Sequence, residues 1–221
     1  MLEIENFRFE ESRFAEAVIK EVFEEDFYDS LGKQRYQTVV DLGAGPGVFS
    51  IFISKHAEKV LAVEPQKENL EILKGNILVN KAENVKIVPY AISTKNGTSK
   101  LFLCEENPTM HSLVYDFGNS SLEVKTLTLP TLISRYRLKE IDLLALDVEG
   151  TEFELFKDEK FLSTLRNKVR NITGELHKFF EREPGIEKLL EELQDIFNLE
   201  VRQIGAKGEL YSVLFKGRRR T

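Results

Sequence analysis

Apolar residues change their spacing along the chain in a way that separates helices from strands. In the middle of the chain, short apolar runs alternate with amphipathic stretches, which is typical of β-α-β units around a parallel sheet. The runs expected as strands are 38–42, 60–63, 85–89, 141–146 and, less clearly, 171–176. The stretches expected as helices are 48–56, 67–80 and 186–198. This pattern predicts an α/β fold with a mostly parallel sheet.

The C-terminal part of the chain departs from this alternation. Residues 199–204 and 210–215 have the composition of strands, and a short stretch with Gly205 and Gly208 separates them. Two strands joined by a short glycine-containing turn indicate a hairpin. We therefore expect the parallel sheet to end in an antiparallel hairpin.

Two further segments lie outside the repeating pattern. Residues 12–27 carry apolar side chains at helical spacing among acidic neighbours, which predicts an amphipathic helix. Residues 100–103 and 124–127 alternate as exposed strands do and are expected to form a small added ribbon, and the role of the insertion at 98–125 is left open. We expect an N-terminal helical extension over 1–36 and one α/β domain over 37–221, because a chain of 221 residues fits a single core.

Charge and composition exclude several classes of protein. The chain carries 37 acidic and 31 basic side chains, a net charge of −6, so it has no general attraction for nucleic acid. No apolar run is long enough to enter a membrane, and the first residues lack the apolar core of a secretory signal. Cys104 is the only cysteine, which excludes an intrachain disulfide and fits a cytoplasmic protein.

A glycine-rich turn follows the first expected strand, in the sequence VVDLGAGPG. Glycine permits tight backbone paths and the close approach of a ligand, and the helix that follows offers free N–H groups. Glu64, at the end of the second expected strand, is placed to accept both ribose hydroxyls of a nucleoside. Pro65 then prevents this strand from continuing.

The turn favours S-adenosylmethionine (SAM) over a dinucleotide. The dinucleotide motif G-x-G-x-x-G needs a third glycine where this chain has Ser50, and the glycines here alternate. The acidic Asp41 also suits a ligand with a sulfonium and an ammonium group, whereas it would repel a pyrophosphate.

A second group of polar residues follows the later strands. Asp147, Glu149 and Glu152 come after the apolar run at 141–146, at the sheet edge where open α/β folds bind ligands. These carboxylates could stabilise the cofactor, bind a metal ion or remove a proton from an acceptor, and Glu152 could instead simply begin the next helix. Glu175 and His177 occupy alternate positions of a strand, so their side chains should share a face. Histidine suits a general base near neutral pH.

Taken together, the motifs DLGAGPGVFS, AVEP, LKGNILVN, LALDVEGTEFELF and GELH resemble those of the FkbM-type methyltransferase family, over about residues 38–177. The resemblance implies a class I methyltransferase (Rossmann-like) fold with seven strands, dependence on SAM and, in most members, methylation of oxygen. The candidate cofactor-binding residues are Asp41, Gly43, Ala44, Gly45, Glu64, Pro65, Tyr90, Ala91 and Asp147.

The acceptor side of the site yields a hypothesis with open alternatives. The candidate catalytic residues are Asp147, His177 and Glu149, and the candidate substrate contacts are Glu152, Glu175 and Asn80. Asn80 could equally end its helix, since asparagine tolerates the left-handed conformation. Asp147 and Glu175 are candidate ligands for Mg²⁺. The expected acceptor is a hydroxyl group of a small molecule or glycan, and an RNA or protein N-methyltransferase and a noncatalytic SAM-binding module are the alternatives. The oligomeric state is left open.

Overall fold

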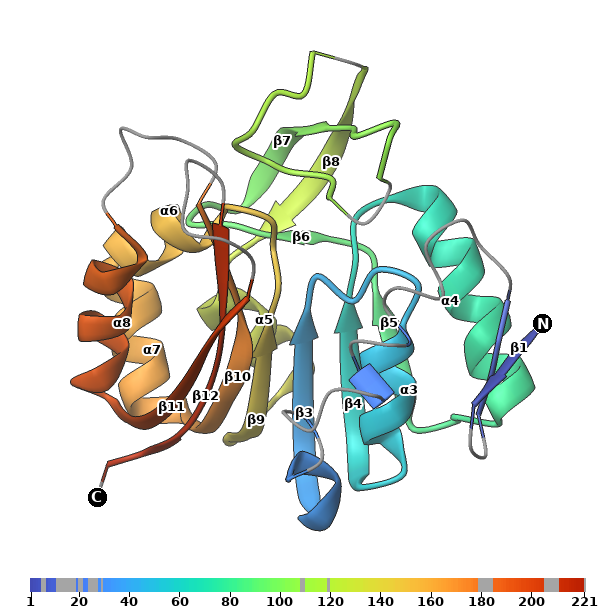
Figure 1. The fold of residues 1–221 in the computed structure, drawn as a ribbon, viewed down its shortest axis with the longest axis horizontal. Coiled ribbons are helices and arrows are strands. Elements are labelled where there is room, and N and C mark those ends of the chain that lie inside the picture. The colour runs from blue at the N-terminus through green and yellow to red at the C-terminus, as the bar shows by residue number, and fades with distance from the viewer. Residues whose placement is uncertain are drawn as a thin grey trace.

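A seven-stranded sheet forms the centre of the molecule, with helices on both faces (Figure 1). A computed structural model describes residues 1–4, 7–10, 19, 22–23, 28, 30–107, 110–118, 120–178, 185–204 and 211–220. The strand order is β11-β12-β10-β9-β3-β4-β5. The chain therefore enters the sheet at its middle, at β3, and extends it first to one side and then to the other.

The sheet is parallel apart from its C-terminal hairpin. Its strands are β3 (Tyr36–Leu42), β4 (Ala57–Val63), β5 (Val85–Val88), β9 (Ile141–Leu146), β10 (Val169–Lys178), β11 (Phe197–Ile204) and β12 (Tyr211–Arg219). The pairs from β10 to β5 are parallel, whereas β12 runs antiparallel to both β10 and β11. This confirms the expected α/β fold with a mostly parallel sheet and a final antiparallel hairpin.

Alternation along each strand creates two hydrophobic cores, one on each face of the sheet. The helices are α3 (Val48–Ser54), α4 (Lys67–Asn80), α5 (Leu129–Tyr136), α6 (Glu152–Lys157), α7 (Glu159–Lys168) and α8 (Ile186–Gln194), with a short 3-10 turn η1 at Leu31–Lys33. Val39 belongs to the core that α3 and α4 cover, and its neighbour Val40 belongs to the core under α5 to α8. Both faces of β3 are thus buried over residues 39–42, as expected of a central strand in a parallel sheet.

The first residues form a hairpin that the sequence pattern did not indicate. Strands β1 (Leu2–Ile4) and β2 (Phe7–Phe9) pair in antiparallel fashion, and β2 packs against α4. Phe7 and Phe9 are buried in the same core as α3 and α4. The helix expected over 12–27 falls mostly on residues outside those described, and it stays a prediction.

The insertion forms an arm above the carboxyl ends of the parallel strands, at the top of Figure 1. Its strands β7 (Gly97–Phe102) and β8 (Ser121–Leu127) pair in antiparallel fashion, and the short β6 (Ala91–Ile92) adds to β8. Apolar side chains of Ala91, Leu101 and Val124 form a small core of their own. The expected ribbon is therefore confirmed, and β6 ties it to the segment that follows β5.

Several element boundaries differ from the sequence expectation. The helix expected over 186–198 was wrong at its end, because the fully buried Phe197 already begins strand β11 and the helix stops at Gln194. The weak strand expected at 171–176 extends over the whole of β10. The turn with Gly205 and Gly208 lies outside the described residues. Among the described helices, none combines the length and the apolar composition needed to cross a membrane.

Candidate active site

The glycine turn after β3 lies against both neighbouring strands. The N–H groups of Gly43 and Ala44 both donate to the carbonyl oxygen of Val63, at 3.0 Å each, which fixes the turn to the end of β4. Gly43 has φ +87°, and a Cβ there would lie 1.7 Å from the backbone oxygen of Asp147. Gly45 has φ +51° with no atom within 4 Å of a Cβ position, so its backbone faces open space. The turn therefore offers exposed backbone to a ligand.

Asp41 lies beneath this turn in a buried position. Its carboxylate accepts a hydrogen bond from the Ser50 hydroxyl, with Oδ2 and Oγ 2.6 Å apart. Burial raises the pKa of Asp41 to about 6, although the Ser50 hydrogen bond lowers it. Ser50, which stands where the dinucleotide motif has its third glycine, thus holds an acidic side chain under the turn.

Glu64 closes the other side of the turn from the end of β4. Its Oε2 accepts from the N–H of Gly45 at 2.9 Å, and its Oε1 accepts from the N–H of Gln66 at 2.8 Å and from the side chain of Asn69 at 3.5 Å. Burial raises the pKa of Glu64 to about 7, against the effect of these hydrogen bonds. All of its partners are neutral donors.

A cavity of about 440 Å³ lies over these residues, within the range of small-molecule sites. The expected cofactor-binding residues Asp41, Gly43, Ala44, Gly45, Glu64, Pro65, Tyr90, Ala91 and Asp147 all line it. Tyr90 and Ala91 come from the segment that links β5 to the arm, and the guanidinium of Arg135 lies 4.7 Å from the centre of the Tyr90 ring. The cavity thus runs from the glycine turn to the base of the arm.

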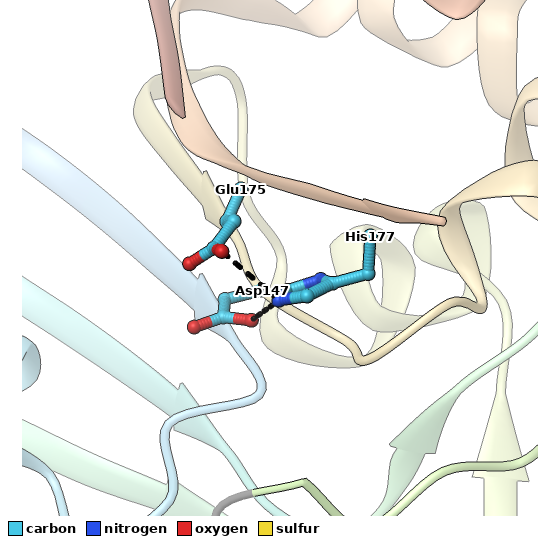
Figure 2. Close-up of side chains that lie close together, drawn as sticks. All are labelled: Asp147, Glu175 and His177. Carbon is cyan, nitrogen blue, oxygen red and sulfur yellow. Dashed lines mark ion pairs between the residues drawn. The ribbon is translucent and has the colours of Figure 1, made fainter. Parts of the chain in front are cut away.

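His177 lies at the far side of this cavity, where carboxylates converge on its ring. Its Nε2 lies 3.3 Å from Glu175 Oε1, 3.5 Å from Glu149 Oε2 and 3.9 Å from Asp147 Oδ1. Figure 2 shows Glu175 and His177 reaching from β10 toward Asp147, which follows β9. Asp147 is held beside β3, since its N–H donates to the carbonyl oxygen of Leu42. The same-face prediction for Glu175 and His177 is confirmed.

Glu152 lies behind the histidine rather than in the cavity. It begins α6, is fully buried, and its Oε1 lies 3.4 Å from His177 Nδ1 and accepts a hydrogen bond from the N–H of Val148. It does not line the cavity. The expected substrate contact by Glu152 is therefore not supported, because the residue lies outside the cavity lining and its Oε1 contacts the histidine ring and the backbone.

The carboxylates determine the charge of His177. Burial lowers the pKa of this histidine, but Glu149, Glu152 and Glu175 outweigh that effect and raise the pKa well above 6.5. At neutral pH the ring is therefore an imidazolium whose charge the carboxylates surround. Glu149 reaches this position from an unusual backbone conformation, with φ +50°.

Asn80 does not belong to this site. Its side-chain oxygen accepts from the N–H of Arg8 at 2.9 Å, and its amide donates to the carbonyl oxygens of Arg8 and Asn76, so it holds the N-terminal hairpin on α4. The alternative, an Asn80 that ends the helix in the left-handed conformation, is also wrong, because Lys81 takes that position with φ 52°. The cavity lining does not include Asn80, and the sequence alone did not reveal its distant partner, Arg8.

Other cavity residues were missed by the sequence analysis. They include Tyr28, Phe49, Met110, His111, Leu113 and Thr173. Thr173 could have been found, since it shares the period-two face of Glu175 and His177. His111 comes from the arm, where its Nδ1 accepts from the N–H of Cys104 at 3.1 Å, and burial lowers its pKa. Nothing in the sequence near His111 signals that the arm reaches the cavity.

Comparisons with known proteins point to a methyltransferase family. The family described as the methyltransferase FkbM domain matches residues 41–203. Methyltransferase sdnD of Sordaria araneosa is 28% identical over 213 aligned residues, which cover 80% of this chain and 81% of that protein.

Solved structures share the fold at low sequence identity. An rRNA methylase from Streptococcus thermophilus aligns with a TM-score of 0.52 and 15% identity, over 86% of this chain and 92% of that one. The methyltransferase FkbM from Methylobacillus flagellatus aligns with a TM-score of 0.56 and 14% identity, over 86% of this chain and 46% of that one. Identities this low establish the class I methyltransferase architecture and nothing about the acceptor.

Proposed function

Because the chain belongs to the FkbM methyltransferase family, whose fold uses SAM, we propose that it transfers a methyl group to a hydroxyl oxygen of a small-molecule or glycan acceptor. One observation carries the proposal: His177 Nε2 points toward Asp147, Glu149 and Glu175, which line the same cavity as the glycine turn. A proton acceptor and the cofactor turn therefore open into one space.

The cavity suits a cofactor that carries positive charge. Its acidic lining residues are Asp41, Glu64, Asp147, Glu149 and Glu175. The imidazolium of His177 is the one cation among the described lining residues, which include no lysine or arginine. SAM supplies a reactive methyl group on a sulfonium and also bears an ammonium group. The backbone of the glycine turn and Asp41 would hold the methionine end, Glu64 would accept the ribose hydroxyls, and Pro65, Tyr90 and Ala91 would contact the adenine.

His177 is the side chain best placed to remove the acceptor proton, which only the neutral fraction of its ring can do. Because the carboxylates raise the pKa of His177, this fraction, and with it turnover, should increase as pH rises. A general base must lie beside the cavity and have its conjugate acid stabilised, and the carboxylates around Nε2 provide that stabilisation. Nδ1 lies against the buried Glu152, which would fix the orientation of the ring in the way a buried carboxylate orients a catalytic histidine. Asp147 remains the second candidate for the base, because it also lines the cavity and its side chain is 47% exposed.

The same charges bear on the choice of acceptor. RNA presents phosphates close to every base and ribose, and the carboxylates around His177 would repel them. A neutral hydroxyl group meets no such penalty. The charge of the described lining therefore favours a sugar or small alcohol over RNA, although a neutral protein side chain is not distinguished by charge.

A magnesium ion is not part of the proposed mechanism. Asp147 and Glu175, the expected ligands, converge on a ring nitrogen, and the three residues bring ligand atoms within 4.8 Å of one another. Mg²⁺ takes oxygen ligands in octahedral geometry, and a site that includes imidazole suits later transition metals better. We therefore expect methyl transfer to proceed in the presence of a chelator.

Labelled SAM provides the test. The purified protein is incubated with methyl-labelled SAM and EDTA, together with separate pools of neutral oligosaccharides and small alcohols, of protein and of RNA. We expect label in the first pool, in a methyl ether that survives alkali. Label found only in RNA or protein would contradict the proposal, and SAM binding by calorimetry without transfer to any pool would favour the noncatalytic alternative.

A further inference from the structure

The backbone of Glu149, whose carboxylate contacts His177, accepts a hydrogen bond from the arm. With φ +50°, Glu149 occupies the left-handed region that side chains other than glycine, asparagine and aspartate rarely adopt. Such a conformation persists only where neighbouring groups fix it. The neighbouring group here is Ser112, whose Oγ donates to the backbone oxygen of Glu149 at 2.5 Å, across 37 residues of sequence.

The hydrogen bonds around the Ser112 hydroxyl determine which acceptor its proton is donated to. The residue is fully buried, and its Oγ accepts from the N–H of Val114 at 3.2 Å and from that of Tyr115 at 3.0 Å. A hydroxyl has one proton and two lone pairs. Since both N–H groups donate to Ser112, its single proton is directed to the oxygen of Glu149.

The backbone around Ser112 is equally constrained. Ser112 and Phe102 exchange both backbone hydrogen bonds, at 2.8 and 3.1 Å, so Ser112 is tied to the end of β7. The N–H of Leu103 donates to the oxygen of Ser120, and the N–H of Cys104 donates to His111. The donor is therefore presented by a structured part of the arm.

We propose that Ser112 is a positioning residue that acts through Glu149: the arm fixes the Glu149 peptide so that its carboxylate lies against His177 Nε2. The relevance of this contact to catalysis rests on the proposed function. The contact itself can be tested without a methyl acceptor, so the two proposals can fail separately.

Imidazole titration followed by NMR measures the contact directly. The full chain, labelled at histidine and kept in EDTA, is compared as wild type, Ser112→Ala, Glu149→Gln and the double variant. Removing the carboxylate or loosening its peptide should lower the pKa of His177 by about half a pH unit or more, and leave that of His56 unchanged. The double variant should match Glu149→Gln, because Ser112 has no route to the histidine once the carboxylate is lost.

A matched control separates positioning from general stability of the arm. Ser121→Ala makes the same substitution at an exposed residue of β8 and should leave the His177 titration as in the wild type. Ser112→Cys, which keeps the shape of the side chain but donates weakly, replaces the alanine variant if that variant fails to fold. The proposal is overturned if His177 titrates normally in folded Ser112 variants, if Ser121→Ala shifts it equally, or if the effect of Ser112→Ala survives undiminished in Glu149→Gln.

Kinetics add a second readout once an acceptor is known. Ser112→Ala should lower kcat by roughly tenfold and leave the KM for SAM within about twofold, because Glu149 lies at the reaction end of the cavity. Equal loss in kcat and in SAM affinity would indicate a general disturbance and would count against the proposal.

Discussion

Carboxylates are buried at both ends of the cavity, but their partners are neutral donors at one end and a cation at the other. At the cofactor end, Asp41 and Glu64 accept hydrogen bonds from neutral groups, and burial raises the pKa values to about 6 and about 7. At the reaction end, the carboxylates around His177 share one cation that the protein itself supplies. The first arrangement favours the arrival of a positively charged ligand, and the second prepares a group that can gain and lose a proton.

This difference explains why the chemistry is divided between separate strands. Glu64 directly follows β4 and Asp41 lies in β3, whereas Glu175 and His177 belong to β10, so β9 lies between the strand of Asp41 and the strand of His177. A single cluster would place the proton of His177 and the charges of the cofactor in direct competition. The comparison predicts that substitutions at one end change turnover and those at the other change cofactor affinity.

The largest expected effect is at His177. His177→Gln should lower kcat by roughly a hundredfold or more, since general-base catalysis contributes about 10²–10⁴, while SAM affinity stays near the wild-type value. Steady-state kinetics and calorimetry measure the two quantities. His56→Gln, a histidine that does not line the cavity, is the matched control. Turnover that survives in both His177→Ala and Asp147→Ala, with SAM still bound, would remove the proposed base.

A smaller effect is expected at Glu64, and it should fall on SAM affinity rather than on turnover. Glu64→Gln should raise the Kd for SAM roughly ten- to hundredfold, because hydrogen bonds to a charged group contribute about 1.5–3 kcal/mol. Turnover at saturating SAM should change little. Glu71→Gln, at an exposed position of helix α4, which follows Glu64 in the chain, is the control. A Glu64 variant that binds SAM normally but turns over slowly would reverse the comparison.

The pH dependence of Glu64 sharpens this prediction. With a pKa of about 7, Glu64 must release a proton below that pH before it can accept both ribose hydroxyls, so the Kd for SAM should rise by up to about tenfold per pH unit as pH falls. The stability of the ligand-free protein should depend on pH in the opposite direction. Its folded state binds this proton more tightly than the unfolded chain, so stability should fall as pH rises from 4.5 to about 7.

His177 affects stability in a different pH window. Its raised pKa means that the imidazolium contributes stability that is fully present below pH 6.5 and is lost as pH rises through the folded-state pKa. The pH dependence of the Tm should therefore weaken between pH 4.5 and about 7 in Glu64→Gln, where Asp41 still contributes, and above pH 6.5 in His177→Gln. Melts that respond to both substitutions in the same window would show that the two ends are coupled.

The cofactor end could be predicted from the sequence because its contacts are local. The glycine turn and Glu64 each follow a strand directly, and the parallel sheet brings those strand ends together. Alternation along one strand likewise placed Glu175 beside His177. In each case the pattern spans only a few residues.

The remaining features depend on contacts that no local pattern contains. The partner of Asn80 is the backbone of Arg8, and the partner of Glu149 is Ser112 in the arm. The position of Glu152 behind the histidine follows from the left-handed backbone at Glu149, which turns the chain between β9 and α6. A side chain whose partner is distant backbone looks in the sequence like a free functional group, which is why Asn80 was assigned to the substrate.

The smallest expected effect is at Asn76, which contacts the cofactor end of the cavity and not the reaction end. Its Oδ1 accepts from the N–H of Glu10 at 2.7 Å, and its amide donates to the carbonyl oxygen of Pro46 in the glycine turn at 2.9 Å. Asn76→Ala should cost about 1–3 kcal/mol of stability, lower the Tm by about 2–4 °C per kcal/mol, and weaken SAM binding a few-fold. Asn80→Ala, which releases the hairpin but makes no hydrogen bond to the turn, should lower the Tm and leave SAM affinity unchanged. If both variants weaken SAM binding equally, the hairpin as a whole supports the glycine turn. If Asn76→Ala also shifts the pKa of His177, the two ends of the cavity are not independent.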